Sequence, residues 1–468
     1  MKAMPLDIGT LHFVGIGGIG MSGIAEVLNI ADYTIQGSDI KDSANVQRLR
    51  DQGIEVFIGH DGAYVENVAA VIISSAVKDD NPEVMAARAA KIPVVRRAEM
   101  LAQLMQMKFA IGIGGTHGKT TTTAMVGQML EAAGLDPTVI NGGIVNSYGT
   151  NTRIGKSDWM VVESDESDGT FIKLPSTAVA ITNIDPEHLD QYGGSFDVLK
   201  EAFKTFVTNI PFYGFAVVCI DHPEVQALIP QIQDRTIITY GFSTQADIRA
   251  DNIRTDKNGT TFDVYADRFD TVLKDMFLPM LGDHNVQNSL VAVATALQLE
   301  IAPALIKKGM ESFTGVKRRF TQTGIVNEVT IIDDYAHHPV EIGVVLKTAR
   351  SAVAGTSGRV IAVAQPHRYS RLNDLFDEFC ACFNDADVAI ISDVYAAGES
   401  PLPGATRDRL VKTMTDRGHR RALALSGEAA LPALIAAEAK PGDIVVCLGA
   451  GTITTWANAL PGALGKIS

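Results

Sequence analysis

The sequence predicts an α/β protein built from three domains, and three observations support this fold class. The chain has 468 residues, and at roughly 150 residues per domain this length suggests about three domains. Short runs of β-branched residues alternate with helix-like patterns along the chain, which is typical of parallel sheets covered by helices. Two glycine-rich clusters each stand between a predicted strand and a predicted helix, as phosphate-binding loops do.

The first hundred residues hold the first set of alternating elements. Strands are predicted at 12–14, 33–37, 54–58 and 69–73, and a helix at 21–28. A helix rich in Met and Gln ends near residue 107, and a new strand starts two residues later. We therefore place the first domain at residues 1–107.

The remaining residues form two further sets of the same kind. Strands are predicted at 109–113, 159–163, 178–183, 216–220 and 236–240, a β-like polar stretch with a turn at 245–268, and helices at 285–299 and 301–312. The last set contains predicted strands at 329–333, 360–364, 388–392 and 444–448. Because a glycine-containing loop separates these sets, we place the second domain at residues 108–314 and the third at 315–468.

The composition is that of an ordinary globular protein and excludes several classes of function. Hydrophobic residues make up 46% and charged residues 20% of the chain, which argues against a disordered protein. Fifty-four acidic against 40 basic residues give a net charge of −14, which argues against a protein that coats nucleic acid. No apolar stretch approaches the ~20 residues that span a bilayer. The N-terminal stretch up to the first glycine cluster lacks the apolar core of a secretory signal.

The cysteines agree with a reducing compartment. Cys219, Cys380, Cys382 and Cys447 are too few and too scattered for a disulfide framework. Cys380 and Cys382 form a C-x-C pair without a second metal-like pair, so we interpret them as core thiols. We expect a cytoplasmic protein without membrane insertion or nucleic-acid partner, and the sequence predicts no oligomeric state.

The first glycine cluster, GIGGIG at residues 15–20, follows a predicted strand and opens a predicted helix. Glycines there allow a tight turn and a close approach of the backbone to a diphosphate at the positive end of the helix. The motif does not distinguish NAD from a UDP-sugar, and a purely structural turn is the alternative. The predicted diphosphate-binding residues are Gly15, Gly17, Gly18, Gly20 and Asp39.

The second glycine cluster, IGGTHGKT at residues 113–120, also stands between a strand and a helix. In such a loop the backbone N–H groups surround phosphates, the lysine reaches the outer phosphates and the next hydroxyl binds Mg²⁺. The spacing departs from the usual P-loop, because Ile113 stands six residues before Lys119. A capped helix start without a ligand is the alternative. The predicted phosphate-binding residues are Gly114, Gly115, Thr116, His117, Gly118, Lys119 and Thr120.

Two acidic clusters follow this loop. Glu163 ends a predicted strand and opens the run ESDESD, and His188 lies in the run TNIDPEHLD after the next strand. Carboxylates at the carboxyl ends of parallel strands, beside a phosphate loop, are placed to hold a hard cation. We therefore predict Thr120, Glu163 and His188 as candidate ligands of Mg²⁺ or Mn²⁺. Without the phosphate loop, a solvated acidic loop would be the better interpretation.

Polar residues in the last third of the chain allow more than one role. Asn285 and Asn288 share one face at the start of a predicted helix, where they either cap the helix or meet a ligand. The run KRR at 317–319 is either a solvated charge run or a phosphate clamp. The runs DDYAHHP at 333–339 and QPHRYSR at 365–371 each follow a strand. We expect these two strands to be neighbours whose ends project His and Arg side chains into one crevice.

Seven motifs, taken in order, resemble those of the Mur ligase family. They are GTHGKT, ESDESD, TNIDPEHLD, HNVQN, KRRF, DDYAHHP and QPHRYSR. The resemblance extends from the first glycine cluster to Gly449 and Gly451, which is nearly the whole chain. It implies an N-terminal Rossmann-like domain for a UDP-sugar, a central P-loop ATPase-like domain and a C-terminal Rossmann-like domain that positions an amino acid.

The resemblance also implies an activity. The implied enzyme is an ATP-dependent ligase that joins L-alanine to the lactoyl carboxylate of UDP-N-acetylmuramate through an acyl phosphate, in peptidoglycan precursor synthesis. A ligase that recycles muropeptides by attaching a tripeptide to the same sugar nucleotide is the alternative. ATP is the implied co-substrate, and Mg²⁺ or Mn²⁺ the implied metal.

The resemblance further assigns roles to the motif residues. It implies catalytic roles for Lys119, Glu163, His188, Arg319 and Asp334. Of the nucleotide-binding residues, Asn285 and Asn288 would meet the adenine, while Arg319 and Asp334 would contact the nucleotide from the third domain. His338, His367, Arg368 and Arg371 would line the pocket for the muramoyl group and the amino acid.

Two functions of other classes stay open on the sequence. A nicotinamide-dependent oxidoreductase built on the first glycine cluster would leave the second cluster and Glu163 unexplained. A non-catalytic module that senses a nucleoside triphosphate would explain the second cluster without any ligation.

Overall fold

The structure is a computed structural model that describes residues 8–74 and 76–466. Residues 1–7, the beginning of the stretch inspected for a signal sequence, lie outside the described residues. Within the described part of the chain, no helix is both long enough and apolar enough for a membrane crossing. All four cysteines are free thiols, and three of them are buried, while Cys382 is half-buried.

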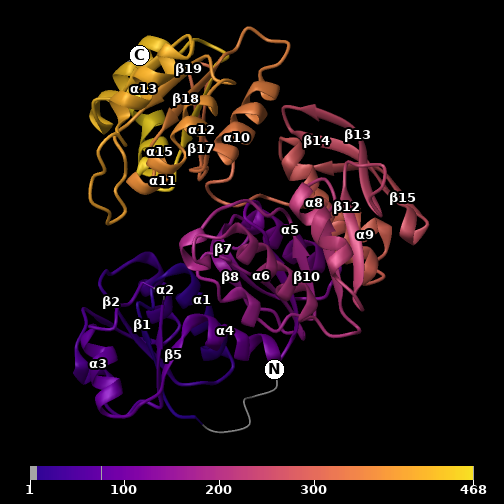
Figure 1. The fold of residues 1–468 in the computed structure, drawn as a ribbon, viewed down its shortest axis with the longest axis vertical. Coiled ribbons are helices and arrows are strands. Elements are labelled where there is room, and N and C mark those ends of the chain that lie inside the picture. Colours follow the sequence, from indigo (N-terminus) through magenta and orange to yellow (C-terminus); the bar gives the residue numbers. More distant parts are fainter. Residues whose placement is uncertain (1–7, 75, 467–468) are drawn as a thin grey trace. The chain divides into compact units, whose positions relative to one another are not determined.

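The first sheet has five parallel strands in the order β3-β2-β1-β4-β5. Its strands are β1 (Leu11–Val14), β2 (Ile35–Asp39), β3 (Glu55–Ile58), β4 (Ala70–Ile73) and β5 (Val94–Arg96). The helices around it are α1 (Ile19–Ile30), α2 (Ala44–Asp51), η1 (Gly62–Val65), α3 (Pro82–Ala89) and α4 (Arg97–Gln106). Figure 1 shows α3 on one side of this sheet and α1, α2 and α4 on the other. Both faces are therefore covered, and β1 is buried along its whole length.

A buried charge network joins α3 to the first sheet. Glu83 on α3 is fully buried and accepts hydrogen bonds from His12 (2.6 Å), Ser38 (2.8 Å) and His60 (2.6 Å). Burial raises the pKa of Glu83, but these hydrogen bonds outweigh it and hold the pKa below its usual value. Gln36 completes the network with a hydrogen bond to His12. The carboxylate is thus charged in the folded state and depends on these partners.

Replacing Glu83 by alanine is expected to lower the free energy of unfolding by about 3 kcal/mol or more. The reason is that removing one partner of a buried charge pair leaves the other groups uncompensated. Urea unfolding of the variant and the wild type measures the difference. The matched control is Glu66→Ala, which removes an exposed carboxylate at the end of η1. Equal stability of the two variants would contradict the expectation.

The second sheet has ten strands in the order β15-β14-β13-β12-β11-β10-β6-β9-β7-β8. Its strands are β6 (Phe109–Gly114), β7 (Thr138–Val145), β8 (Thr150–Arg153), β9 (Trp159–Glu163), β10 (Ala178–Ile181), β11 (Phe215–Cys219), β12 (Thr236–Gly241), β13 (Ile248–Asp256), β14 (Gly259–Ala266) and β15 (Thr271–Leu278). Strand β6 pairs in parallel with β9 on one side and β10 on the other. The strand order therefore reverses at β6, and the crevice at such a point is where open α/β sheets bind ligands.

Helices and short turns connect the strands of the second sheet. They are α5 (Lys119–Ala132), η2 (Phe171–Lys173), η3 (Leu189–Tyr192), α6 (Phe196–Thr208), α7 (Pro223–Leu228), η4 (Ile229–Gln231), η5 (Asp267–Phe269), α8 (Asp283–Gln298) and α9 (Pro303–Glu311). Helix α5 follows β6 directly, so the loop between them lies at the reversal point. This is the loop that carries the second glycine cluster.

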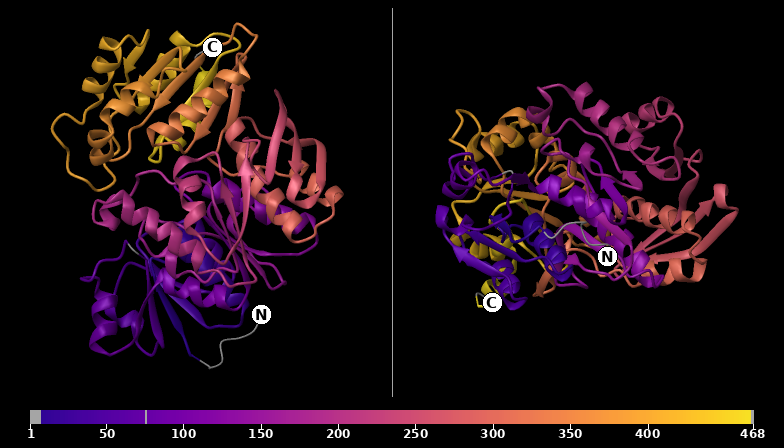
Figure 2. Two further views of the ribbon diagram at one scale, coloured as in Figure 1. Left: turned by 45° about the vertical axis from the view of Figure 1, so that its right-hand side comes forward. Right: turned by 90° about the horizontal axis from the view of Figure 1, so that it is seen from below.

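The third sheet has six strands in the order β16-β17-β21-β18-β19-β20. Its strands are β16 (Thr321–Val326), β17 (Val329–Asp334), β18 (Val360–Ala364), β19 (Val388–Ile391), β20 (Ala422–Ala424) and β21 (Ile444–Leu448). The helices are α10 (Pro339–Ala352), α11 (Tyr369–Asp374), α12 (Phe376–Ala381), α13 (Arg407–Asp416), η6 (Glu428–Ala430), α14 (Leu431–Glu438) and α15 (Ile453–Leu464). Apolar side chains from α10 to α13 cover one face of the sheet, and those of α14 and α15 cover the other, so the sheet lies between two helix layers (Figure 2).

The sequence predicted that β17 and β18 are neighbours in this sheet, and this prediction is wrong. Strand β21 pairs in parallel with both β17 and β18 and so separates the two strands that were expected to be adjacent. The last strand of the chain is inserted between earlier ones, which is a long-range pairing that no local sequence pattern encodes.

The described residues pack as two compact units. The first contains the first sheet, most of the second sheet and the chain up to Thr314. The second begins at Gly315 and also includes the segments 253–261 and 278–286. The first two predicted domains therefore share one unit, and the limits 1–107, 108–314 and 315–468 stay a prediction.

Candidate active site

The glycines of the second cluster shape the loop between β6 and α5. Gly115 has φ +131°, and a Cβ atom there would lie 2.0 Å from Oγ1 of Thr182. Gly118 has φ +81°, and its Cβ would lie 2.7 Å from Oδ1 of Asn288. Because L-residues rarely adopt these φ values and no side chain fits, both positions require glycine.

The segment after β10 holds this loop by its backbone. The N–H of Thr116 donates to the carbonyl of Asn183 (3.1 Å), and the N–H of His117 donates to Oδ1 of Asn183 (2.7 Å). The hydroxyl of Thr182 donates to the carbonyl of His117 (2.6 Å). These two amides are therefore occupied, and the N–H groups offered to a phosphate are those of the first turn of α5, which begins at Lys119.

Lys119 lies folded into the loop. Its ammonium donates to the carbonyls of Gly115 (2.7 Å) and Thr116 (3.0 Å) and to a carboxylate oxygen of Glu166 (2.7 Å), and Asp165 lies 3.9 Å away. Burial lowers the pKa of Lys119, but the surrounding carboxylates outweigh burial and raise the pKa above its usual value. Lys119 is thus a permanent cation at the start of α5.

Thr120 and Glu163 come together beside Lys119. The hydroxyl of Thr120 donates to Oε1 of Glu163 (3.0 Å), and the N–H of Gly142 donates to Oε2 (2.6 Å). Burial raises the pKa of Glu163. A hydroxyl and a carboxylate held in this way are hard oxygen donors of the kind that Mg²⁺ takes beside a phosphate.

The structure places His188 next to Asp165. His188 has φ +55° and precedes η3. Burial raises the pKa of Asp165, but Lys119 and the hydrogen bonds from Ser167 outweigh burial and lower this pKa, with a smaller contribution from His188. Its Nε2 lies 3.8 Å from a carboxylate oxygen of Glu187. Within the described part of the chain, no group of three His, Cys, Asp or Glu side chains is arranged to hold a metal ion. Thr120, Glu163 and His188 include only two side chains of these types, so their assignment as metal ligands stays a prediction.

Asn285 and Asn288 are both buried in the first turns of α8. The side-chain amide of Asn285 donates to the carbonyl of Leu281 (2.8 Å), whereas a helix cap accepts a hydrogen bond from a backbone N–H. Asn288 faces Gly118 of the phosphate loop. The structure thus brings Asn288 to the loop.

The first glycine cluster forms the turn from β1 to α1, as predicted. The N–H of Gly17 donates to Oδ2 of Asp39 (2.9 Å), and a Cβ at Gly17 would lie 2.9 Å from that oxygen. A Cβ at Gly20 would lie 2.6 Å from the guanidinium of Arg97, which also lies 3.6 Å from Asp168 of the run ESDESD. Arg97 thus lies between the first cluster and the acidic loop, a role that the sequence analysis missed because only the fold brings these segments together.

Asp334 organises the backbone at the start of the second unit. Its Oδ2 accepts from the N–H of Phe320 (2.7 Å) and its Oδ1 from the N–H of Ala336 (2.8 Å). Burial raises its pKa to about 6. The guanidinium groups of Arg318 and Arg319 lie 4.7 Å and 5.4 Å from the centre of the Tyr335 ring. The KRR run is therefore anchored at two of its three residues rather than fully solvated.

The His and Arg residues after β17 and β18 meet although their strands are not adjacent. The rings of His337 and His367 lie 6.0 Å apart, and His367 stacks on Tyr395 at 5.5 Å. Burial, helped by nearby cationic groups, lowers the pKa of His367 to about 4, so this imidazole is neutral at pH 7. Arg371 contacts His367 at 3.5 Å. Tyr395 was missed by the sequence analysis, since a single Tyr in a loop carries no signal.

Two further predicted residues have clear local positions. His338 is the N-cap of α10, and its Nδ1 accepts from the N–H of Val340 (3.3 Å). Arg368 has φ +69° and precedes α11. A positive φ at a residue with a long side chain is strained and occurs mostly where the surrounding structure enforces it.

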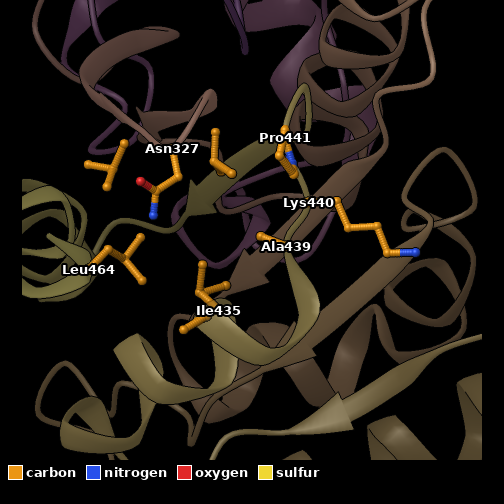
Figure 3. Close-up of a pocket in the computed structure, with 9 residues that line it drawn as sticks. Asn327, Ile435, Ala439, Lys440, Pro441 and Leu464 are labelled. Atoms are coloured by element: carbon orange, nitrogen blue, oxygen red, sulfur yellow. The ribbon is translucent and has the colours of Figure 1, made fainter. Parts of the chain in front are cut away.

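A separate cavity is lined by none of these residues. It has a volume of about 250 Å³ and is lined by the β16–β17 turn, the end of α14 and the end of α15. Figure 3 shows Asn327, Ile435, Lys440 and Leu464 around it. Because it lies where β17 begins, while the motif residues follow the strand's carboxyl end, it is not part of the candidate active site.

Three family models match the chain in order. The Mur ligase family catalytic domain matches residues 10–109, the Mur ligase middle domain matches residues 113–296, and the Mur ligase glutamate ligase domain matches residues 318–451. The chain belongs to the Mur ligase family. The predicted fold class, three α/β domains of the Mur ligase type, is thereby confirmed.

Named Mur ligases resemble this chain over its whole length. The UDP-N-acetylmuramate–L-alanine ligase of Parvibaculum lavamentivorans is 61% identical over 471 residues, which cover 100% of this chain and 95% of the relative. The enzyme of the same name from Rhodospirillum rubrum is 61% identical, over 98% of this chain and 96% of the relative.

Solved Mur ligase structures share the fold. The UDP-N-acetylmuramate-alanine ligase of Thermotoga maritima has a TM-score of 0.81 and 27% identity and covers 98% of this chain and 100% of that chain. A murein peptide ligase of Psychrobacter arcticus has a TM-score of 0.70 and 22% identity, over 98% of this chain and 99% of that chain.

Proposed function

We propose that this Mur ligase uses ATP to join L-alanine to the lactoyl carboxylate of UDP-N-acetylmuramate, in peptidoglycan precursor synthesis. The observation that carries the proposal is the phosphate loop with Lys119, Thr120 and Glu163 at the reversal point of the second sheet. It occurs in a chain that is 61% identical to relatives named for this reaction. The tripeptide-adding alternative has weaker support, because both of these relatives at 61% identity bear the name of the alanine-adding reaction.

The reaction needs an activated carboxylate. A carboxylate oxygen is a poor leaving group, so an amine does not displace it at a useful rate. Transfer of the γ-phosphoryl group of ATP to the lactoyl carboxylate gives an acyl phosphate. The amine of L-alanine then attacks the acyl carbon, and inorganic phosphate leaves as the amide forms.

The main task of the site is to neutralise charge. The carboxylate and the triphosphate are both anions, and they repel each other as the phosphoryl group is transferred. Lys119 supplies a permanent cation, and the N–H groups of the first turn of α5 supply partial positive charge. We assign phosphate binding to this turn and to Lys119, while the amides of Thr116 and His117 keep their bonds to Asn183.

The residues present fit a divalent cation. Thr120 and Glu163 would hold Mg²⁺ or Mn²⁺ together with phosphate oxygens, and His188 is the third candidate. When bound, such a cation withdraws negative charge from the phosphoryl group that is transferred. Such a small set of protein ligands suits Mg²⁺, because Mg²⁺ commonly binds one or two protein side chains and keeps its other positions for phosphate and water.

The remaining motifs are assigned to substrate recognition. We assign Gly15, Gly17, Gly18, Gly20 and Asp39 to the UDP-sugar, because the N-terminus of α1 offers N–H groups to a diphosphate. Asn285 and Asn288 are assigned to the adenine side, and Arg319 and Asp334 to the nucleotide. His338, His367, Arg368 and Arg371 are assigned to the muramoyl group and the amino acid.

The domain roles follow from these assignments. We assign residues 1–107 to the UDP-sugar, residues 108–314 to ATP and residues 315–468 to the amino acid. The three substrates are small molecules, two of them nucleotides of the cytoplasm, and we propose that the enzyme acts there.

An assay of ADP release tests the proposed function. With ATP, Mg²⁺ and UDP-N-acetylmuramate present, ADP release should require L-alanine, and the alanylated sugar nucleotide should appear in equal amount. Replacing L-alanine by glycine, L-serine or the tripeptide measures selectivity. Turnover with the tripeptide but not with L-alanine would favour the recycling ligase, and saturable NAD binding without ADP release would favour an oxidoreductase.

A further inference from the structure

Glu166 is a buried carboxylate that the proposed mechanism does not use. Its side chain is 1% exposed, and one oxygen accepts the hydrogen bond from Lys119 at 2.7 Å. The other oxygen, Oε1, has no hydrogen-bond partner among the described residues. The hydroxyl of Tyr192 donates to the backbone carbonyl of Glu166 at 2.6 Å and fixes the residue in place.

Glu166 therefore forms an ion pair with Lys119. A phosphate that binds at the start of α5 needs the same ammonium group, which already donates to Glu166 and to two carbonyls of the loop. A side chain as buried as Glu166 keeps its charge at a large cost unless a cation stays beside it. The phosphate and the Glu166 carboxylate thus compete for Lys119.

Within the described part of the chain, Lys119 is the cation that contacts Glu166. The other groups that face Glu166 are Asp165 on the same loop and Tyr192 in η3. Asp165 is a like charge and opposes the ionised form of Glu166. Burial raises the pKa of Glu166 to about 7 even with Lys119 beside it, and a phosphate that draws Lys119 away raises it further.

We propose that Glu166 is a positioning residue that holds Lys119 until a nucleotide phosphate takes its place, and that Glu166 then takes up a proton from solution. The proposal rests on the proposed function, because it needs a nucleoside di- or triphosphate to bind the GTHGKT loop. The proposal predicts that nucleotide binding is coupled to the uptake of a proton by Glu166. Phosphate binding by Lys119 alone would not require this proton.

Calorimetric titration with ADP tests the proposal. The titration is carried out at pH 7.5 in EDTA, in buffers that differ in their ionisation enthalpy, so that the protons taken up per bound ADP are measured. The wild type should take up roughly half to one proton. E166Q should take up almost none and should bind ADP about tenfold more tightly, because no ion pair has to be broken.

Matched variants identify the group that takes up the proton. E201Q removes an exposed carboxylate on α6 and should behave as the wild type. E163Q tests the neighbouring buried carboxylate, because proton uptake that disappears in E163Q and persists in E166Q would belong to Glu163. E166D is the second test if E166Q does not fold, because its shorter side chain weakens the contact with Lys119 and should also tighten ADP binding.

Several outcomes would overturn the proposal. Proton uptake that persists in E166Q, or that disappears in E163Q instead, would assign it to another group. Weaker ADP binding by folded E166Q would show that Glu166 supports the nucleotide rather than competing with it. If the wild type binds no ADP, both the proposed ligase function and the proposed role of Glu166 are wrong. If it binds ADP with proton uptake but forms no alanylated product, only the proposed ligase function is wrong.

Discussion

Replacing Lys119 by alanine is expected to reduce formation of the alanylated sugar nucleotide by at least about 1000-fold. Lys119 is the one cation that the structure places at the start of α5 among the described residues of this loop, and phosphoryl transfer depends on charge stabilisation more than on covalent chemistry. Initial rates of product formation, measured by chromatography, give the effect. Near-normal turnover of the variant would contradict the assignment of Lys119 to phosphate binding.

The Lys119→Ala variant also needs a control for folding. The substitution leaves Glu166 buried without a cation, so a loss of stability has to be separated from a loss of catalysis. Intrinsic fluorescence and circular dichroism should show a folded protein. In the double variant K119A/E166Q, stability should return toward the wild type while the activity stays lost, because the buried charge is gone and the catalytic cation is still missing.

Replacing Glu163 by alanine is expected to lower the rate of Mg²⁺-dependent ADP release by at least about 100-fold and to raise the Mg²⁺ concentration needed for half-maximal activity. Glu163 accepts from Thr120 and from the N–H of Gly142, so it fixes the hydroxyl that would share the cation. A Mg²⁺ titration of ADP release in the presence of UDP-N-acetylmuramate measures both quantities.

The control for Glu163 separates charge from geometry. E163Q keeps a side chain of the same length, which still accepts from Thr120 or Gly142, but it lacks the negative charge. It should therefore fold like the wild type. Like Glu163→Ala, it should need a higher Mg²⁺ concentration than the wild type for half-maximal activity. An unchanged Mg²⁺ dependence in both variants would contradict the metal assignment.

Most strands were predictable because their sequences are buried and rich in β-branched residues. Strands β9, β18 and β21 begin and end where the pattern of Val and Ile predicts. Several strands that sequence reasoning missed are short or polar, such as β8, which reads TNTR, and β16, which reads TQTGIV, although the longer and more apolar β7 and β15 were missed as well. Strands β8 and β16 are stabilised by pairing with β7 and β17 rather than by their own composition.

The candidate site was predictable where one local motif carries the chemistry. Gly115, Gly118 and Lys119 stand in a single loop whose spacing already indicates phosphate binding. The roles of Glu166 and Arg97 are visible only in contacts between residues that are far apart in the sequence. Glu166 contacts Lys119, and Arg97 lies beside Asp168. One sequence does not report such contacts.

The amino-acid sequence by itself determined the three-part α/β organisation, the phosphate loop and the family, because these depend on local periodicity and on short motifs. Only the tertiary structure decided that β21 lies between β17 and β18, that Asn183 occupies the amides of Thr116 and His117, and that Glu166 neutralises Lys119. The physical reason is that strand pairing, desolvation and charge compensation depend on which distant residues meet, and the chain decides this only when it packs as a whole.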